Sequence, residues 1–110
     1  RNKYMKVLKL EQFTKGWVVG DFEPSIIRTK DFEVSVRNYE AGDTETEHIH
    51  KVATEITIIT SGIFEMNGHR LVAGDVVVLE PGQSARFACV ESGSNTIIKT
   101  PSVIGDKYPV

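Results

Sequence analysis

Short runs of apolar residues, each bounded by glycine, proline, asparagine or aspartate, recur along the chain. Residues 32–39 alternate between two faces, which is typical of a strand whose two sides meet different surroundings. Residues 76–79 are apolar at every position, which predicts a strand covered on both faces. No stretch of 11 residues shows a helical period. The pattern therefore predicts an all-β protein built from many short strands.

The dipeptide Asn67-Gly68 is the clearest turn signal, because both residues tolerate positive φ and the pair favours a tight hairpin. Residues 91–95 are polar and predict a further turn. Strands of this number and spacing fit a β-sandwich or barrel, including the double-sheet jelly roll. The expected strands are residues 4–10, 25–28, 32–39, 44–50, 55–60, 63–66, 69–72, 76–79, 85–90 and 96–99, and residues 17–19 form a short apolar run between two glycines.

Three side chains that can bind a metal, His48, His50 and Glu55, lie within eight residues. His48 and His50 are two residues apart, so both project from the same side of an extended strand. Glu45 and Glu47 fall on the opposite side, where we expect an exposed face. Residues 51–54 predict a turn, after which Glu55 opens the next strand and can return to face the two imidazoles.

Two neutral imidazoles and one carboxylate on a common wall form a site for a divalent transition metal rather than for calcium, which prefers oxygen ligands alone. The donor types do not distinguish Fe, Mn, Ni, Zn and Cu. The alternative is a hydrogen-bonded polar wall that lines a pocket without metal. The third histidine, His69, adjoins the expected hairpin tip, where we expect it to be solvated.

The stretch from Gly42 to Gly62 resembles the first cupin motif, Gly, five residues, His-x-His, three or four residues, Glu, six residues, Gly. Residues 42, 48, 50, 55 and 62 fill all five positions. Residues 74–82 resemble the start of the second motif, with two departures. Glu80 stands where the motif has proline, and Ala85 stands where it has histidine, normally the fourth metal ligand.

The resemblance covers about residues 30–100 and implies a cupin-type jelly-roll β-barrel. We expect one domain spanning residues 1–110, with residues 1–29 packed on the core. With Ala85 in place of histidine, the ligand set is two imidazoles and one carboxylate, as in the facial triad of non-haem iron oxygenases. Such a set leaves coordination positions open to substrate.

Six residues are the predicted lining of a substrate pocket: Arg37, Tyr39, Glu80, Ala85, Phe87 and Cys89. Glu80 could supply a substitute oxygen ligand. Cys89 could supply a sulfur, but its simpler interpretation is a small buried apolar residue. Arg37 is the nearest candidate to pair with an anionic substrate if its face of the strand points inward.

Three functions fit these features. The first is a metal-dependent cupin enzyme, of dioxygenase or isomerase type, that acts on a small polar molecule. The second is a metal-free cupin of the sugar-nucleotide ketoisomerase or epimerase type, in which His48 or His50 acts as acid and base. The third is a non-catalytic module that binds or senses a small molecule.

The composition argues against several classes of binding partner. The 110 residues support one domain, and the formal net charge of −2 gives no electrostatic footprint for nucleic acid or an anionic membrane. No apolar run approaches the ~20 residues of a membrane span, and the sequence, which begins at Arg1, shows no signal peptide. The single cysteine forms no internal disulfide. We expect a cytoplasmic protein and, from the resemblance and from apolar residues on both faces of strands 55–60 and 76–79, a homodimer.

Overall fold

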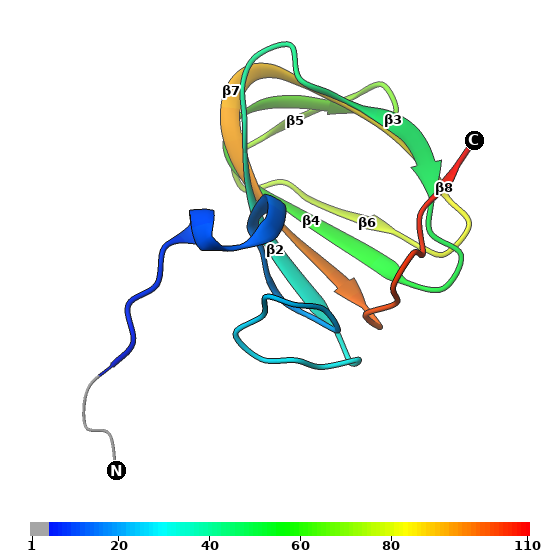
Figure 1. Ribbon diagram of the computed structural model, residues 1–110. Coiled ribbons are helices and arrows are strands. Elements are labelled where there is room, and N and C mark those ends of the chain that lie inside the picture. The colour runs from blue at the N-terminus through cyan, green and yellow to red at the C-terminus, as the bar shows by residue number, and fades with distance from the viewer. Residues whose placement is uncertain (1–4) are drawn as a thin grey trace.

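The computed structural model describes residues 5–110, and their strands form an antiparallel sheet that curls into a barrel (Figure 1). The first elements are the short 3-10 helices η1 (Leu10–Gln12) and η2 (Thr14–Gly16). The strands are β1 (Trp17–Val19), β2 (Glu33–Tyr39), β3 (Thr44–Ile49), β4 (Thr54–Met66), β5 (His69–Val72), β6 (Val76–Leu79), β7 (Ser84–Thr100) and β8 (Tyr108–Pro109).

Strands β4 and β7 are long enough to run through both layers of the barrel. One layer contains β1, β2, the second half of β7, the first half of β4, and β6. The other contains β8, β3, the first half of β7, the second half of β4, and β5. The jelly-roll expectation is confirmed.

The bend in these two strands depends on a pair of glycines. Gly62 of β4 has φ +78°, and a Cβ there would lie 2.6 Å from the Cα atom of Gly93 in β7. A Cβ on Gly93 would in turn lie 2.5 Å from the Cα atom of Gly62. The backbones therefore approach more closely than any larger residue allows, and the register shifts on both sides of Ser61. The final glycine of the first cupin motif thus marks the corner of the barrel.

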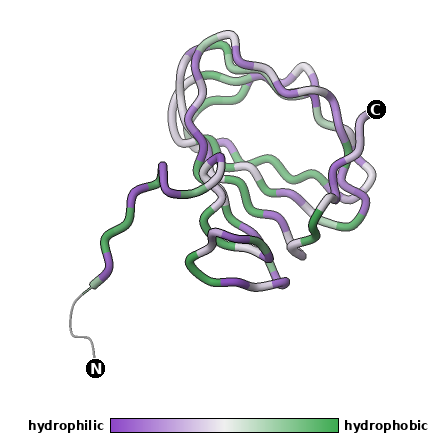
Figure 2. The backbone as a smooth tube through the Cα atoms, in the orientation of Figure 1, coloured by the Kyte–Doolittle hydropathy of each residue, from purple (hydrophilic) through white to green (hydrophobic). Residues whose placement is uncertain are grey.

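A hydrophobic core fills the part of the barrel between the β4–β5 hairpin and β7. Phe64 is fully buried and stacks on Phe87 with ring centroids 5.1 Å apart, while Tyr39 meets both rings edge-on. Cys89, Leu71 and Met66 complete this cluster together with Ile59, Leu79 and Ala85. The tube in Figure 2 shows hydrophobic stretches along the layer that carries β4 and β6. The remaining interior is open to polar side chains.

Several expected elements differ in the structure. The segments 55–60 and 63–66 form one strand, as do 85–90 and 96–99, because antiparallel pairing of β4 with β7 continues through the bend. The polar turn expected at 91–95 is therefore wrong, since these residues belong to β7. The hairpin at Asn67-Gly68 is confirmed, with φ of +51° and +83°.

Two expected strands near the N-terminus are absent from the described residues. Residues 25–28 form bends and make only two backbone hydrogen bonds to the β1 region, through Ile26 and Ile27. Residues 5–9 form no strand and run away from the barrel as an exposed arm (Figure 1). Tyr4, the first residue of that expected strand, lies outside the described residues. The prediction that both faces of residues 76–79 are covered is also wrong within one chain. Val76 and Val78 are 58% and 53% exposed, and their strand, β6, pairs only with β4.

Candidate metal centre and its cavity

The three metal-competent side chains meet inside the barrel. His48 lies near the end of β3, His50 follows that strand, and Glu55 is the second residue of β4. All three are buried, and one nitrogen or oxygen from each lies within 4.8 Å of the others. His50 Nε2 is 3.2 Å from Glu55 Oε1, and the two imidazole centroids are 5.1 Å apart. The turn at residues 51–53 thus returns the chain so that the carboxylate faces the imidazoles.

An irregularity in β3 sets which side chains point inward. Glu45 is the partner of Phe87 and His48 is the partner of Ala85, so three steps along β3 match two along β7. This extra residue is a β-bulge, which shifts the phase of the alternating side chains. Glu45 and His48 consequently both line the interior. The expectation that Glu45 lies on an exposed outer face is wrong, because strict alternation does not survive a bulge.

Backbone carbonyl groups fix the outer edge of both imidazoles. His48 Nδ1 lies 2.8 Å from the Thr46 oxygen, and His50 Nδ1 contacts the Asp106 oxygen. A carbonyl only accepts, so each Nδ1 carries the proton that it donates. A neutral ring then presents an unprotonated Nε2, the form that binds a metal, and such outer hydrogen bonds are the usual support of ligating histidines.

The Asp106 carboxylate holds the turn between the ligands. Its oxygens accept backbone N–H groups from Lys51, Val52 and Ala53 at 2.8 to 3.2 Å. Burial raises the pKa of Asp106, but these three hydrogen bonds lower it by more, so its pKa lies below the ordinary value. Asp106 therefore positions His50 through its main chain and the approach to Glu55 through its side chain.

His50 and Glu55 form a buried pair with opposite pKa shifts. The hydrogen bond to Glu55 raises the pKa of His50 by more than burial lowers it. Burial would raise the pKa of Glu55, but the hydrogen bond and charge of His50, with Lys99 and His48 nearby, hold it below the ordinary value. Without a metal, both ring nitrogens of His50 face acceptors, so the ring needs two protons. A cation between Nε2 and the carboxylate would replace the second proton.

These side chains fit a divalent transition metal. Ligands bonded at about 2.1 Å to one ion, at tetrahedral or octahedral angles, lie about 3.0–3.4 Å apart. The His50–Glu55 separation of 3.2 Å is in that range. The donor atoms of all three residues lie within 4.8 Å of one another, so a small inward movement of the side chains would bring the whole set into the range. Two imidazoles and a carboxylate suit Fe, Mn, Ni, Zn and Cu alike.

A cavity of about 340 Å³ adjoins the three side chains, with His48 and Glu55 in its wall. Of the six residues predicted to line a pocket, three do so: Arg37, Ala85 and Phe87. Tyr39 and Cys89 belong to the hydrophobic core, and burial raises the pKa of the Cys89 thiol. Glu80 is exposed in the turn after β6 and does not line the cavity.

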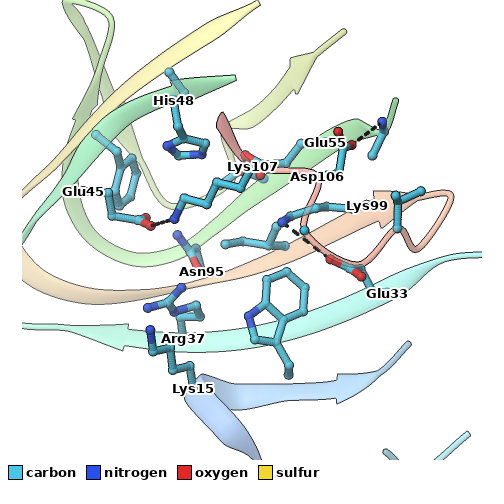
Figure 3. Close-up of a pocket in the computed structure, with 18 of the residues that line it drawn as sticks. Lys15, Glu33, Arg37, Glu45, His48, Glu55, Asn95, Lys99, Asp106 and Lys107 are labelled. Carbon is cyan, nitrogen blue, oxygen red and sulfur yellow. Dashed lines mark hydrogen bonds and ion pairs between the residues drawn. The ribbon is translucent and has the colours of Figure 1, made fainter. Parts of the chain in front are cut away.

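Most of the charged lining was missed by the sequence analysis. Lys99 Nζ lies 3.5 Å from Glu33 Oε1 and 4.8 Å from the Trp17 ring centroid, and Lys107 Nζ lies 4.0 Å from Glu45 (Figure 3). Tyr39 donates its hydroxyl proton to Glu45 at 3.1 Å. Glu33 and Lys99 have the sequence pattern of solvated strand positions, and only the register of β2, β7 and β4 reveals that their faces turn inward.

The chain is similar to known proteins in structure but not in sequence families: no protein-family model and no curated protein matches it. Among solved structures, it is similar to KdgF from Halomonas sp., with 25% identity over 68% of this chain and 74% of that chain and a TM-score of 0.61. An uncharacterized protein with a double-stranded β-helix domain from Klebsiella pneumoniae has 21% identity, 96% and 93% coverage, and a TM-score of 0.68.

A third similar structure is the DMSP lyase DddQ from Ruegeria pomeroyi, with 21% identity over 86% of this chain and 49% of that chain, and a TM-score of 0.70. Several similar structures are named as cupins. The chain has the cupin fold, a double-stranded β-helix, as the resemblance of its two motifs implied. In the described part of the chain, no helix is long and apolar enough to cross a membrane.

Proposed function

We propose that the protein is a metal-dependent cupin enzyme that acts on a small polar molecule. The observation that carries the proposal is the meeting of His48, His50 and Glu55, with donor atoms within 4.8 Å, beside a cavity large enough for a small metabolite. A purely structural role does not require three buried metal-competent side chains to converge, or two of them to face a cavity.

The residues of the site and its cavity would have distinct roles. His48, His50 and Glu55 hold the ion, and the bound ion would supply Lewis acidity. Ala85, the partner of His48 across β3 and β7, leaves open the space that an imidazole of the usual fourth ligand would fill. Substrate oxygen atoms therefore have room to approach the ion. Phe87 and Met66 give the cavity an apolar wall that limits water.

Glu45 is the lining carboxylate best suited to accept a proton from substrate. Glu33 is engaged by Lys99 and the Ser102 hydroxyl, and Asp106 by three backbone N–H groups. Among residues 5–110, Glu45 has only the Tyr39 hydroxyl at 3.1 Å and the more distant Lys107 ammonium as partners. A carboxylate with fewer fixed partners has lone pairs free to accept a hydrogen bond from a substrate hydroxyl. Both dioxygenase and isomerase chemistry remain compatible with this set.

One observation favours the metal-free alternative, a ketoisomerase or epimerase of the sugar-nucleotide type. His48 lines the cavity, its Nδ1 is held by Thr46, and its Nε2 is left to exchange a proton with a ligand. His50 and Glu55 would then be a structural ion pair behind it. The third function, a non-catalytic binding module, would use the same cavity without chemistry.

Metal analysis separates the metal-dependent enzyme from the two functions that need no metal. The protein should be purified without metal-chelating resin, and its metal content measured by mass spectrometry before and after incubation with Fe, Mn, Ni, Zn and Cu salts. The proposal expects about one ion per chain, removed by a chelator and restored by metal. If no ion binds under any of these conditions, the metal-dependent enzyme is excluded. The metal-free enzyme and the binding module then remain, and an assay of sugar-nucleotide turnover distinguishes them.

We also propose that two copies associate through the outer face of the sheet that contains β2, β7, β4 and β6. Directly paired residues form two rows across these four strands that are apolar except at Thr96, and the Val76 and Val78 ends are exposed. A contiguous apolar surface of this kind is typical of a protein–protein interface, and a second copy presents the same surface across a two-fold axis. The rows are Val34, Ile98, Ile56 and Val78, and Val36, Thr96, Ile58 and Val76.

A further inference from the structure

The cavity contains a buried amide that the protein leaves without a partner. Asn95 is 1% exposed and lines the cavity, yet neither its Oδ1 nor its Nδ2 has a hydrogen-bond partner among the described residues. Its amide lies near enough to the Tyr39 hydroxyl to offset part of the rise that burial causes in the pKa of Tyr39, but the two side chains do not meet in hydrogen-bond geometry. A buried amide in this state is destabilising. An apolar residue of the same shape would pack here at less cost, so the amide has a use other than packing.

The strand register places Asn95 beside an arginine without an ion-pair partner. Asn95 of β7 is the direct partner of Arg37 in β2, and the side chains of directly opposed residues on one face start about 5 Å apart. Arg37 also lines the cavity. Its guanidinium contacts the Tyr39 ring at 5.4 Å, and no carboxylate within residues 5–110 forms an ion pair with it.

Lys15 adds a second positive charge at the same end of the cavity (Figure 3). A Cβ on the neighbouring Gly16 would lie 2.0 Å from the Val36 carbonyl oxygen, so η2 presses directly onto β2 next to Arg37. Among the described residues, Lys15 also forms no ion pair. Lys99 and Lys107, the other cavity cations, have Glu33 and Glu45 as partners. The unneutralised positive charge of the cavity is therefore concentrated around Asn95.

We propose that Arg37 and Asn95 form an oxyanion subsite, with Lys15 at its rim, that binds the carboxylate or phosphate of the substrate. A guanidinium donates two parallel hydrogen bonds to such a group, and the amide Nδ2 donates another. This inference rests on the proposed function, because the other end of the same ligand would reach the ion held by His48, His50 and Glu55. The substrate class is then a small anionic molecule with oxygen donors at its far end.

The spacing of the sheet limits the length of that molecule. The row of Arg37, Asn95 and Ile59 lies four residues along β4 from the row that contains Glu55, which is about 13 Å of strand. Side chains enter the cavity from both rows, so the ligand spans less than this distance. A hydroxylated chain of about six carbons is shorter than this limit, and the cavity of about 340 Å³ has room for it.

Three probes test the subsite: D-gluconate, D-glucitol 1-phosphate and D-glucitol. They share the configuration of the hydroxylated chain, and at its first carbon they carry a carboxylate, a phosphate ester or a neutral alcohol. Titration calorimetry on metal-free and metal-loaded protein should give at least tenfold tighter binding of one anion than of D-glucitol in both forms. The tighter of the two anions identifies the group. Equal binding of all three probes overturns the subsite.

Variants separate the subsite from general effects of charge. Arg37→Met should abolish the preference for the anion, while Arg86→Met, the same change at an exposed position of β7, should retain it. Asn95→Leu keeps the shape of the buried side chain. It should weaken binding of the anion at least fivefold and leave the thermal midpoint unchanged or higher. If Asn95→Leu lowers the midpoint and binds the anion as wild type does, Asn95 is structural and the subsite is wrong.

The outcomes also distinguish this inference from the proposed function. A protein that binds the anion through Arg37 but never binds metal retains the subsite and loses the metal-dependent enzyme. Conversely, a protein that binds one metal ion per chain but shows no preference for an anion retains the enzyme proposal and loses the subsite.

Discussion

The main-chain oxygen of Asp106 accepts the Nδ1 proton of His50, although the two residues are 56 positions apart in the chain. The Asp106 carboxylate simultaneously caps the turn that follows His50. The C-terminal segment therefore fixes both the tautomer of one candidate ligand and the path of the chain to the next. This relationship makes the candidate metal site depend on a residue outside both cupin motifs.

Asp106→Asn is expected to lower both stability and metal affinity. The amide cannot accept all three backbone N–H groups, and its own N–H₂ group faces donors. We expect a loss of about 2 kcal/mol in the free energy of unfolding, and a loss in metal affinity of about tenfold or more. Denaturant titration and metal competition with a chromophoric chelator measure the two quantities.

Asp75→Asn is the matched control, because Asp75 caps the turn at Val72 with an equivalent bond of 2.7 Å outside the cavity lining. It should cost stability but leave metal affinity unchanged. The stability difference between wild type and Asp106→Asn should also depend on pH. The pKa of Asp106 is lower in the folded state, so its contribution is full above the unfolded value of about 3.8 and is lost as the pH falls through the folded value. Equal metal affinity in all three proteins would contradict the positioning role of Asp106.

His48→Ala and His50→Ala should each remove most of the bound metal while the protein stays folded. Loss of one of three donors is expected to weaken binding by about 100-fold or more, since each ligand contributes several kcal/mol. His50→Ala should be the less stable of the two, because Glu55 then remains buried without its 3.2 Å partner. Metal content and circular dichroism test both statements. His69→Ala, an exposed position, is the control and should bind metal normally.

Val78→Glu should convert the proposed dimer into a monomer at micromolar concentration. Val78 ends one apolar row of the outer face, and a carboxylate there would have to lose its hydration on association. Light scattering measures the mass directly. Val72→Glu introduces the same charge on β5, in the other layer of the barrel, and should leave the mass unchanged. A wild-type monomer at these concentrations would exclude the interface altogether.

The sequence predicted the fold and the position of the three candidate ligands because both depend on local signals. Glycines mark the turns, and the spacing of His48, His50 and Glu55 follows from one strand, one turn and the start of the next. The spacing did not reveal the bulge between Glu45 and His48, because a bulge forms only when a partner strand sets the register. Glu45 was consequently assigned to the wrong face.

The rest of the cavity is assembled from residues that are remote in sequence. Lys99, Glu33 and Glu55 form one row across three strands, and Asn95 pairs with Arg37 in another. Each is an ordinary polar residue of a strand or expected turn when considered alone. Its inward direction depends on continuous pairing of β7 with β2 and β4, which the sequence analysis had divided by a turn at 91–95. The missing strand at residues 5–10 has the same origin, since a strand requires a partner as well as a pattern.

Ala85 stands where the second cupin motif has its histidine ligand. Ala85 is buried, lines the cavity and is the direct partner of His48. Ala85→His should therefore add a fourth donor beside the other three and raise metal affinity by about tenfold or more. It should also lower any turnover, because the added imidazole occupies the space through which substrate would reach the ion.

Ala85→Leu separates these two effects, since it fills the same space without a donor. It should lower turnover in the same way but leave metal affinity at the wild-type value, with at most about 1–3 kcal/mol of destabilisation from the added volume. Metal competition and turnover measured on both variants test the prediction. If Ala85→His binds metal no more tightly than Ala85→Leu does, position 85 does not face the ion. The open coordination position inferred from the second motif would then be wrong, even if His48, His50 and Glu55 hold the metal.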